Sequence, residues 1–335
     1  MARFAAIHVA LPPHRVPQAE LRRIAEKVYA GRRELLALLR LFDRCGVEAR
    51  HLSFPPGYYA EPRPFEARNA DFLRKAVELG AQAARGALEK AGVRPERVDH
   101  VIVATTTGLA TPSLDALLVE PLGLRPDVRR WPLFGLGCAG GVGAIGRAAE
   151  IVGERHETAL VLSVELSGQV FSHEALSPVD VLGAALFGDG AAAAVVRGGE
   201  GLLRPSSRLF EKSAEKMGWR FGGDGLRLVL SEEIQPLLRA GLRGAVEAAL
   251  GGERPRFWAL HPGGPKILEA YAEALGLSEA ELGPSRRTLA RIGNVSGASA
   301  LFALAELWPE TRPGDRVFAA APGPGFALES VLIGC

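Results

Sequence analysis

The chain has 335 residues, 47% hydrophobic and 23% charged, a composition typical of a globular protein with a large core. Its 40 basic residues nearly balance 38 acidic ones, and charges of one sign form no long run. This pattern argues against a nucleic-acid partner, and the lack of a long apolar run argues against membrane insertion. The three cysteines (Cys45, Cys138 and Cys335) are far apart, so we expect free thiols and a cytoplasmic protein.

Helix-like and strand-like segments alternate along the chain. Residues 70–92 have apolar residues at helical spacing and end in Gly92. "HVIVATTTG", from His100, and "TALVLSVEL", from Thr158, have the apolar composition of buried strands. Between them, a glycine-rich turn around Cys138 opens the helical pattern "GVGAIGRAAE". This alternation predicts an α/β fold.

An internal repeat divides the chain. An offset of 156 positions places "HVIVATTTG", from His100, on "RFWALHPGG", from Arg256. The same offset places "LGCAGGVGAIGRAAE", from Leu136, on "IGNVSGASALFALAE", from Ile292. A third pair, "GAAAAVVRG" and "GFALESVLIG", follows at another offset. We therefore predict two similar α/β halves, residues 1–200 and 201–335.

The repeat makes Cys138 equivalent to Asn294 and Thr105 equivalent to His261. Cys138 and Asn294 each stand at a glycine-rich turn that opens a helix. If the halves pack about a pseudo-twofold axis, these two helix starts meet, and His261 lies in the adjoining loop. The repeat thus predicts that a thiol, an imidazole and an amide converge.

These three groups suit nucleophilic catalysis on a thioester. A helix N-terminus and an ion pair with His261 would lower the pKa of the Cys138 thiol, and the thiolate is the nucleophile. His261 and Asn294 could then donate hydrogen bonds to a developing oxyanion or enolate. Structural readings remain open: Cys138 as a small buried side chain, Asn294 as a helix cap, and "FGDG" and "APGPG" as turns.

Five motifs occur in a characteristic order: "GLGCAGG", "LFGDGAAA", "WALHPGGPKILE", "RIGNVSGAS" and "PGPGFALE". With them the chain resembles the type III polyketide synthases, the chalcone synthase-like members of the thiolase superfamily, and in "MGWRFGGDGLRLVLS" their bacterial branch. The resemblance implies a thiolase-like five-layered α/β/α/β/α fold with internal duplication, in a homodimer. It also implies decarboxylative condensation of malonyl-CoA onto an acyl-CoA starter, with CoA thioesters as substrates and with no cofactor or metal.

The resemblance also assigns roles to residues. Cys138 would carry the acyl group, while His261 and Asn294 would drive decarboxylation. Phe187 would be a gatekeeper, and Leu228 stands where plant enzymes have a second gatekeeper phenylalanine. The remaining cavity positions are Thr105, Thr106, Thr107, Ser167, Trp219 and Ser296, and the CoA-binding positions are Arg40, Arg44, Gly263, Gly264 and Lys266.

Several alternatives stay open at this stage. A ketoacyl synthase III-like enzyme shares the fold and a Cys–His–Asn set, papain-like peptidases have the same residue order, and a non-catalytic scaffold is a third class. Leu228 and the 7% aromatic content favour a medium or long aliphatic starter and an alkylpyrone or alkylresorcinol-type product. A naphthalene-forming synthase that uses malonyl-CoA alone is the competing interpretation.

Overall fold

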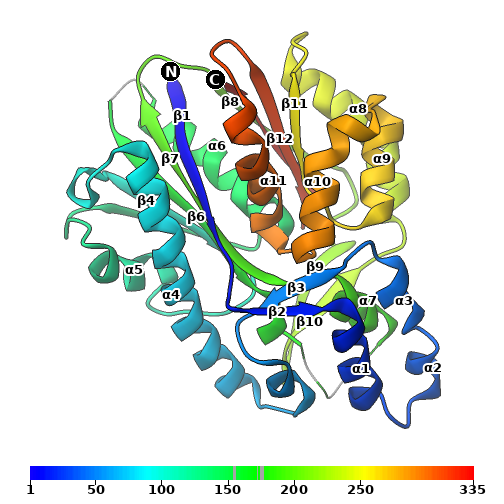
Figure 1. Ribbon diagram of the computed structural model, residues 1–335. Helices are drawn as coiled ribbons and strands as arrows, with labels where there is room; N and C mark the ends of the chain where they lie inside the picture. Colours follow the sequence, from blue (N-terminus) through cyan, green and yellow to red (C-terminus); the bar gives the residue numbers. More distant parts are fainter. Residues whose placement is uncertain (154–155, 172, 174–176) are drawn as a thin grey trace.

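Two β-sheets, with helices between them and on their outer faces, make up the protein (Figure 1). The computed structural model describes residues 1–153, 156–171, 173 and 177–335. In spatial order, the first sheet consists of β1 (Ala2–Ala10), β7 (Asp189–Gly198), β6 (Thr158–Leu166), β4 (His100–Thr105) and β5 (Arg129–Phe134). The second consists of β11 (Phe257–Leu260), β12 (Arg316–Gly323), β13 (Ala327–Gly334) and β8 (Leu203–Leu209).

The two sheets have the same topology. In the first, β1 pairs antiparallel with β7, β7 antiparallel with β6, and β6 parallel with β4. In the second, β8, β13, β12 and β11 repeat this order and these directions. The predicted duplication is therefore confirmed, and β5 is an addition to the first sheet.

Side-chain alternation along the central strands produces five layers. In β7, Ala192 and Ala194 face the inner core, while Ala191 and Ala193 face the outer one. In β12, Phe318 faces the opposite core from its two neighbours. The inner core contains α6 (Gly140–Val152) and α11 (Ser299–Leu307). The outer faces are covered by α4 (Phe65–Ala91) and α5 (Leu114–Leu122) on the first sheet, and by α8 (Ile234–Leu250), α9 (Pro265–Leu275) and α10 (Glu279–Ile292) on the second.

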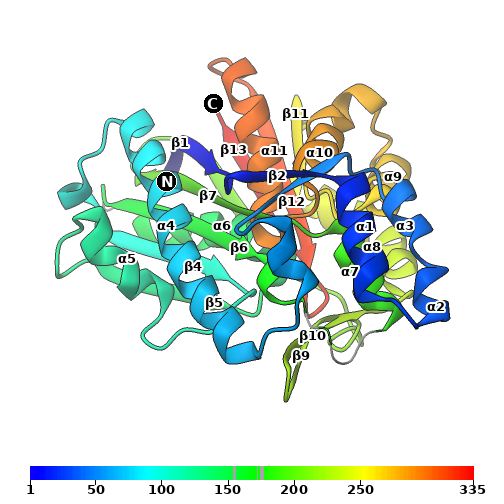
Figure 2. The same ribbon diagram turned by 60° about the horizontal axis from the view of Figure 1, so that its bottom comes forward.

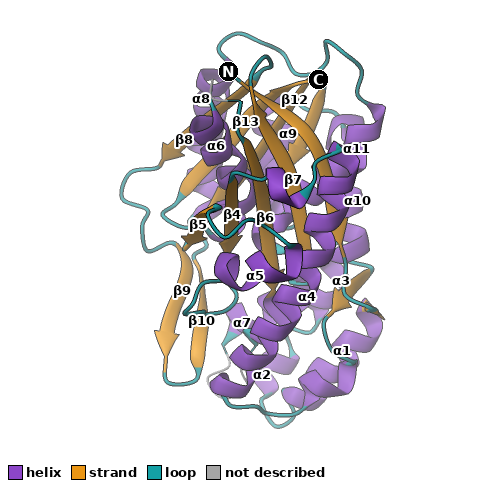
Figure 3. Ribbon diagram, turned by 90° about the vertical axis from the view of Figure 1, so that its left-hand side faces the viewer, coloured by secondary structure: helices purple, strands orange, loops and turns teal. Residues whose placement is uncertain are grey.

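Smaller elements gather at the edge where the second sheet's outer helices lie. Figure 2 shows short helices beside α8 and α9, and Figure 3 shows a hairpin extending from the sheets. The helices are α1 (Gln18–Val28), α2 (Arg33–Leu36), α3 (Arg40–Arg44) and α7 (Pro178–Leu186). The hairpin is β9 (Met217–Gly222) with β10 (Gly225–Leu230), and β2 (His14–Pro17) pairs with β3 (Ala49–Leu52).

Single-turn 3-10 helices complete the chain. They are η1 (Pro56–Ala60), η2 (Pro95–Arg97), η3 (Gly137–Ala139), η4 (Ser167–Gln169), η5 (Ser296–Ala298) and η6 (Trp308–Glu310). The helix predicted to begin at residue 70 begins at Phe65, and it ends as expected because Gly92 caps it with a φ of +61°. None of the described helices has the length and apolar character needed to cross a membrane.

The division of the chain at residue 200 stays a prediction. The chain passes from the first sheet to the second between Gly198, the end of β7, and Leu203, the start of β8. However, Val16, Leu21 and Phe42 pack in the same core as the outer face of the second sheet. The first fifty residues or so therefore contribute to the packing of the second half.

The two inner helices begin against each other. A Cβ atom built on Gly141 would lie 2.3 Å from the Gly297 carbonyl oxygen, and one built on Gly297 would lie 2.8 Å from the Gly137 carbonyl oxygen. Gly141 and Gly297 are equivalent in the repeat, so the contact lies on the pseudo-twofold axis. Only glycine allows the two backbones to approach this closely. The predicted meeting of the helix starts is therefore present.

Replacing one of these glycines tests this packing. We expect Gly141→Ala to lower the free energy of unfolding by about 1–3 kcal/mol, because the new methyl group meets a backbone carbonyl that no rotamer change can move. Gly244, exposed on α8 with nothing within 4 Å of a built Cβ, is the control. Gly244→Ala should stabilise by about 0.5–1 kcal/mol. Urea unfolding of both variants measures these free energies. An unchanged midpoint of the urea transition for Gly141→Ala would contradict the prediction.

Candidate active site

Cys138 lies in η3, two residues before α6 begins, at the carboxyl end of the first sheet. Gly137 precedes it with a φ of +50°, and a Cβ there would lie 2.5 Å from the Pro324 side chain. The chain therefore needs glycine immediately before the cysteine, both for its backbone conformation and for its contact with the turn after β12. Cys138 is partly exposed and is not in a disulfide, so a substrate can reach its sulfur.

Asn294 joins the second half to the loop that carries Phe187. Its backbone N–H donates to the Leu186 carbonyl at 2.8 Å, and its carbonyl accepts from the Gly188 N–H at 3.0 Å. Phe187 and Asn294 thus form a parallel β-bridge. A Cβ on Gly293 would lie 2.5 Å from the Leu186 carbonyl, which explains the glycine before Asn294.

The Asn294 side chain is fixed by its own helix start. Its Oδ1 accepts from the Ser296 N–H at 2.8 Å and from the Ser299 hydroxyl at 3.3 Å. Its Nδ2 donates to the Gly263 carbonyl at 3.4 Å. An amide nitrogen has two N–H groups, so this arrangement leaves donor capacity for a ligand. Asn294 can therefore cap the helix start and still donate a hydrogen bond to a ligand, because the cap orients its amide.

His261 follows β11 and is 2% exposed. Its backbone N–H donates to Ala320, while its Nδ1 has no hydrogen-bond partner among the described residues. Burial lowers the pKa of the His261 imidazole to about 3, so the ring is neutral at physiological pH. A Cβ on Gly263 would lie 3.3 Å from its Nε2, so the glycine leaves room beside the ring.

The resting thiol is neutral too. Burial raises the pKa of Cys138 to about 12, and the nearby Glu165 charge adds to this rise, while hydrogen bonds with Ser296 and Asn294 oppose it. The Cys138 sulfur lies 3.9 Å from the Ser296 hydroxyl oxygen. The expected lowered thiol pKa and thiolate–imidazolium pair are therefore wrong for the unliganded site. Desolvation outweighs the hydrogen bonds that favour the thiolate, and the thiol must lose its proton when substrate reacts.

Glu165, which the sequence analysis did not identify, is buried beside the two helix starts. Its carboxylate accepts from the Thr106 N–H at 3.1 Å and from the Thr107 hydroxyl at 2.8 Å. Burial raises its pKa to about 7 despite these hydrogen bonds. The signal was present, since Glu165 is the single acid in the otherwise apolar segment "TALVLSVEL".

A mostly apolar cavity of about 110 Å³ is lined in part by Phe187, while Asn294, which is bridged to Phe187, does not line it. Four of the predicted cavity residues line it: Phe187, Ser167, Trp219 and Leu228. The ring centroids of Phe187 and Trp219 are 6.4 Å apart, and Leu228 is directly opposite Trp219 in the β9–β10 hairpin. The other four predicted cavity residues (Thr105, Thr106, Thr107 and Ser296) do not line this cavity. Thr106 and Thr107 bind Glu165, Ser296 lies beside Cys138, and Thr105 ends β4.

The predicted CoA-binding residues lie outside the cavity. Arg40 and Arg44, in α3, and Lys266, at the start of α9, are exposed. A Cβ on Gly46 would lie 3.4 Å from the Pro265 side chain, so the end of α3 is beside the start of α9. The other two predicted CoA-binding residues, Gly263 and Gly264, form the turn between β11 and α9. The described residues include no group of three or more His, Cys, Asp or Glu side chains placed to hold a metal ion.

The comparisons with known proteins identify the family. Residues 55–200 match the N-terminal domain, and residues 226–334 the C-terminal domain, of chalcone and stilbene synthases. The chain belongs to this family. A 1,3,6,8-tetrahydroxynaphthalene synthase of Streptomyces peucetius subsp. caesius is 37% identical over 355 residues, covering 98% of this chain and 92% of that protein. A putative chalcone synthase of Bacillus subtilis is 30% identical, covering 99% of this chain and 98% of its own.

Solved structures confirm the thiolase-like fold. The 1,3,6,8-tetrahydroxynaphthalene synthase of Streptomyces coelicolor, a bacterial type III polyketide synthase, superposes with a TM-score of 0.93 at 29% identity, covering 99% of both chains. A polyketide synthase of the brown alga Ectocarpus siliculosus gives a TM-score of 0.91 at 26% identity, covering 99% of this chain and 97% of its own. The protein is thus a type III polyketide synthase, an acyltransferase that forms carbon–carbon bonds, and the peptidase, scaffold and ketoacyl synthase III alternatives are set aside.

The effect of Glu165 on the nucleophile can be measured directly. Above pH 7 the Glu165 charge disfavours the Cys138 thiolate, so Glu165→Gln should lower the thiol pKa and speed alkylation by iodoacetamide a few-fold at pH 9. At pH 6 Glu165 is mostly protonated, and the rates should be similar. Mass spectrometry of each cysteine gives the rates, with Cys335 in the same sample as the control. Equal Cys138 rates at pH 9 would rule out this coupling.

Proposed function

We propose that Cys138 is the acyl-carrying nucleophile and that His261 and Asn294 stabilise the enolate of malonyl-CoA. The observation that carries this proposal is the convergence of two equivalent helix starts. One presents a reachable thiol, and the other presents an amide oriented by its own cap. The Asn294 amide also contacts the carbonyl of Gly263, two residues after His261, so the imidazole loop adjoins the same point.

The neutral resting state suits the chemistry. In the first step the thiol of Cys138 attacks the acyl-CoA thioester, its proton passes to the neutral His261 imidazole, and CoA leaves as its thiol after taking that proton. Malonyl-CoA then loses CO₂, and the electron pair of the broken bond becomes an enolate on the thioester oxygen. N–H donors of His261 and Asn294 stabilise that oxygen. The enolate carbon attacks the acyl thioester and expels the Cys138 sulfur, which takes up a proton. The chain, now two carbons longer, is a CoA thioester and returns to Cys138 by the first step before the next extension.

Two substitutions separate these steps. Cys138→Ala should abolish condensation while slow malonyl-CoA decarboxylation continues, because only acyl transfer needs sulfur. Asn294→Ala should reduce decarboxylation by about 10²–10³ while a starter still acylates Cys138. Release of ¹⁴CO₂ and intact-protein mass spectrometry, without any carrier protein, measure both steps. Polyketide formation by Cys138→Ala would refute the assignment of the nucleophile.

We further propose a medium or long aliphatic acyl-CoA starter, extended to an alkylpyrone or alkylresorcinol-type product. The cavity supports this proposal, because Leu21, Ile24 and Val28 of α1 contribute apolar side chains to its wall and Leu228 stands where plant enzymes have an aromatic gatekeeper. Two relatives named as 1,3,6,8-tetrahydroxynaphthalene synthases favour the alternative, in which malonyl-CoA is the only substrate. No metal or redox cofactor is part of either scheme.

Starter preference distinguishes the two schemes. Each buried methylene contributes about 0.8 kcal/mol, so kcat/KM should rise from acetyl-CoA through hexanoyl-CoA to lauroyl-CoA until the cavity is full. A flat or falling series would reject the aliphatic starter. Equally fast product formation from malonyl-CoA alone would establish the naphthalene-forming alternative.

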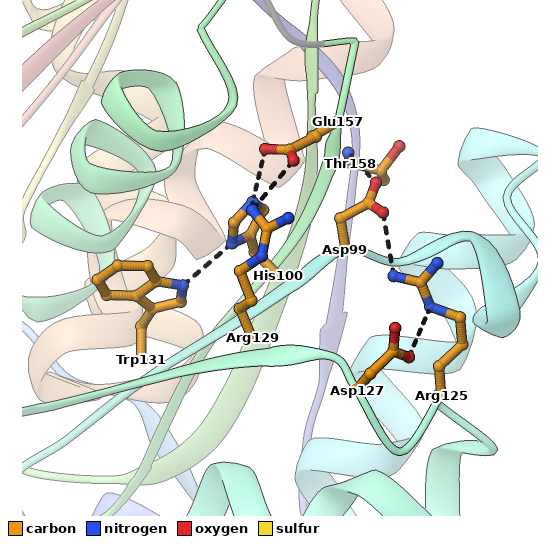
Figure 4. Close-up of polar contacts among 8 residues, drawn as sticks. All are labelled: Asp99, His100, Arg125, Asp127, Arg129, Trp131, Glu157 and Thr158. Atoms are coloured by element: carbon orange, nitrogen blue, oxygen red, sulfur yellow. Dashed lines mark hydrogen bonds and ion pairs between the residues drawn. The ribbon is translucent and has the colours of Figure 1, made fainter.

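We propose that two copies of the chain form a homodimer through β5. We also propose that the protein is located in the cytoplasm. Among the described strands, β5 has a neighbour on one side only, and Trp131 and Phe134 in it are 41% and 51% exposed. An apolar free edge of this kind favours pairing with another chain, and a second copy offers the same edge. Figure 4 shows how Trp131 is held: its indole N–H donates to the Nδ1 of buried His100 at 3.1 Å.

The three free cysteines support the cytoplasmic location, which cell fractionation tests.

The mass in solution tests the dimer. The protein should elute from size exclusion with light scattering at twice the 35.5 kDa of one chain. Trp131→Arg should shift the protein toward the monomer. In the dimer, the new guanidinium of one copy would face the same group of the other copy across the paired β5 edges, and like charges repel. Phe221→Arg, at an exposed position in the β9–β10 hairpin, serves as the matched control and should leave the mass unchanged. A monomeric natural protein would exclude the dimer.

A further inference from the structure

A second cavity lies at the end of the first sheet that is remote from Cys138. Its volume is about 420 Å³, and its wall includes four arginines, Arg3, Arg94, Arg97 and Arg197. Thr158, which also lines it, begins β6, whereas Glu165 lies seven residues further along the same strand. At about 3.3 Å per residue, the cavity is about 23 Å from Glu165. It is therefore separate from the catalytic centre.

The strand order brings two of these arginines together. Arg3 of β1 is paired with Arg197 of β7, and Arg197 is paired on its other side with Thr158 of β6. Cross-strand partners lie on the same face of a sheet, with their Cβ atoms about 5 Å apart. This face is the outer one, because Ala193 and Val195, at alternate positions before Arg197, pack in the core under α4. Like charges directly opposite each other destabilise a sheet, so the pairing of Arg3 with Arg197 calls for an explanation.

The other two arginines come from the turn after α4. That helix ends at Ala91, and the chain then places Arg94, and Arg97 of η2, in the wall of the same cavity. Within the part of the chain that the structure describes, no carboxylate lies at ion-pair distance from any of the four guanidinium groups. The C-terminal end of a helix carries only about half a negative charge, so α4 does not balance them.

Asp99 is the only acid among the described residues that line this cavity, and it is already engaged. Figure 4 shows its carboxylate between two partners: Oδ1 accepts from the Arg125 guanidinium at 3.2 Å, and Oδ2 accepts from the Thr158 backbone N–H at 2.9 Å. The neighbouring Glu157 carboxylate is bound to His100 at 2.9 Å instead. The cavity therefore has a positive charge that none of the described acids balances.

Hydration explains part of this arrangement. Arg3, Arg94 and Arg97 are exposed, so water can solvate each of them, as on any charged surface. Hydration does not explain why Arg3 stands opposite the half-buried Arg197, or why the two other arginines share their cavity. An anion held between them would replace repulsion by attraction. Guanidinium groups bind phosphate oxygens in a bidentate geometry, and one phosphate group offers enough oxygens for more than one arginine.

We propose that this cavity binds the phosphate groups of a small, multiply charged anion, with Arg3, Arg94, Arg97 and Arg197 as donors. Free phosphate or pyrophosphate and the phosphates of a nucleotide share this chemistry. Such an anion would hold β1 against β7 and would link both strands to the turn after α4. The site is additional to the proposed function and does not depend on it.

Calorimetry on the natural protein tests the site. The ligands are inorganic phosphate, pyrophosphate and adenosine 3′,5′-bisphosphate, at constant ionic strength made up with sodium chloride. Surface ion pairs are individually weak, but four acting together should give pyrophosphate a dissociation constant of about 1 mM or below. Arg197→Gln should weaken this binding by about 5-fold or more. Tighter Arg197-dependent binding of the bisphosphate than of pyrophosphate would identify a nucleotide as the source, and the opposite order would identify the free anion.

Thermal unfolding of Arg197→Gln supplies two readouts of opposite sign. In chloride alone its melting temperature should equal or exceed that of the natural protein, because one of two opposed like charges is gone. Pyrophosphate at a 100-fold excess over its dissociation constant should raise the melting temperature of the natural protein by about 2–4 °C. Arg197→Gln should lose most of this rise, and so should Arg97→Gln. An arginine with a purely structural role would instead lower the melting temperature in chloride when it is replaced.

Arg23→Gln is the matched control, since Arg23 is exposed on α1, does not line the cavity and has no ion pair among the described residues. It should keep the full response to pyrophosphate. Equal responses of the natural protein and Arg197→Gln would overturn the inference. An equal loss in Arg23→Gln would also overturn it, because the effect would then come from net charge rather than from a site. No binding of any of the three ligands at about ten times the expected dissociation constant would do the same.

Discussion

The close contact between the two inner helix starts determines the geometry of the site. Gly141 and Gly297 let two backbones touch on the pseudo-twofold axis, and this contact places η3 against η5. Because Cys138 belongs to one of these turns and Asn294 leads directly into the other, no separate scaffold is needed to bring thiol and amide together. The two sheets repeat one topology around this point, so the site results from the duplication itself.

Burial sets the electrostatics of the site. Cys138, His261 and Glu165 are held where burial opposes charge, which favours the neutral form of each group. A neutral thiol and a neutral imidazole avoid the cost of a buried ion pair before substrate arrives. The Asn294 amide is oriented in advance by its own helix start, so in the proposed function it need not reorganise when charge develops on the substrate.

The sequence allowed the fold to be predicted, and the convergence of the proposed catalytic residues, because an internal repeat and short glycine-rich motifs indicate both. The repeat paired Cys138 with Asn294, and glycines marked the turns where backbones approach. The thiol pKa was predicted wrongly, because desolvation depends on everything packed around the sulfur. Glu165 left a trace as one acid in an apolar strand, but the part of the cavity wall that α1 supplies left none. Leu21, Ile24 and Val28 line the cavity beside Trp219 and Leu228, and only the packing of distant segments shows this.

The backbone bridge between Phe187 and Asn294 links two properties of the enzyme. Two backbone hydrogen bonds join the segment of Phe187, which borders the cavity, to Asn294, whose amide is proposed to stabilise the enolate, and Arg50 donates to the Phe187 carbonyl. A substitution that shifts the Phe187 backbone to admit a different chain must also shift the Asn294 amide. Specificity and rate are therefore mechanically linked, and variants selected for a new substrate will keep their speed only where the change is confined to side chains on the cavity side of the bridge.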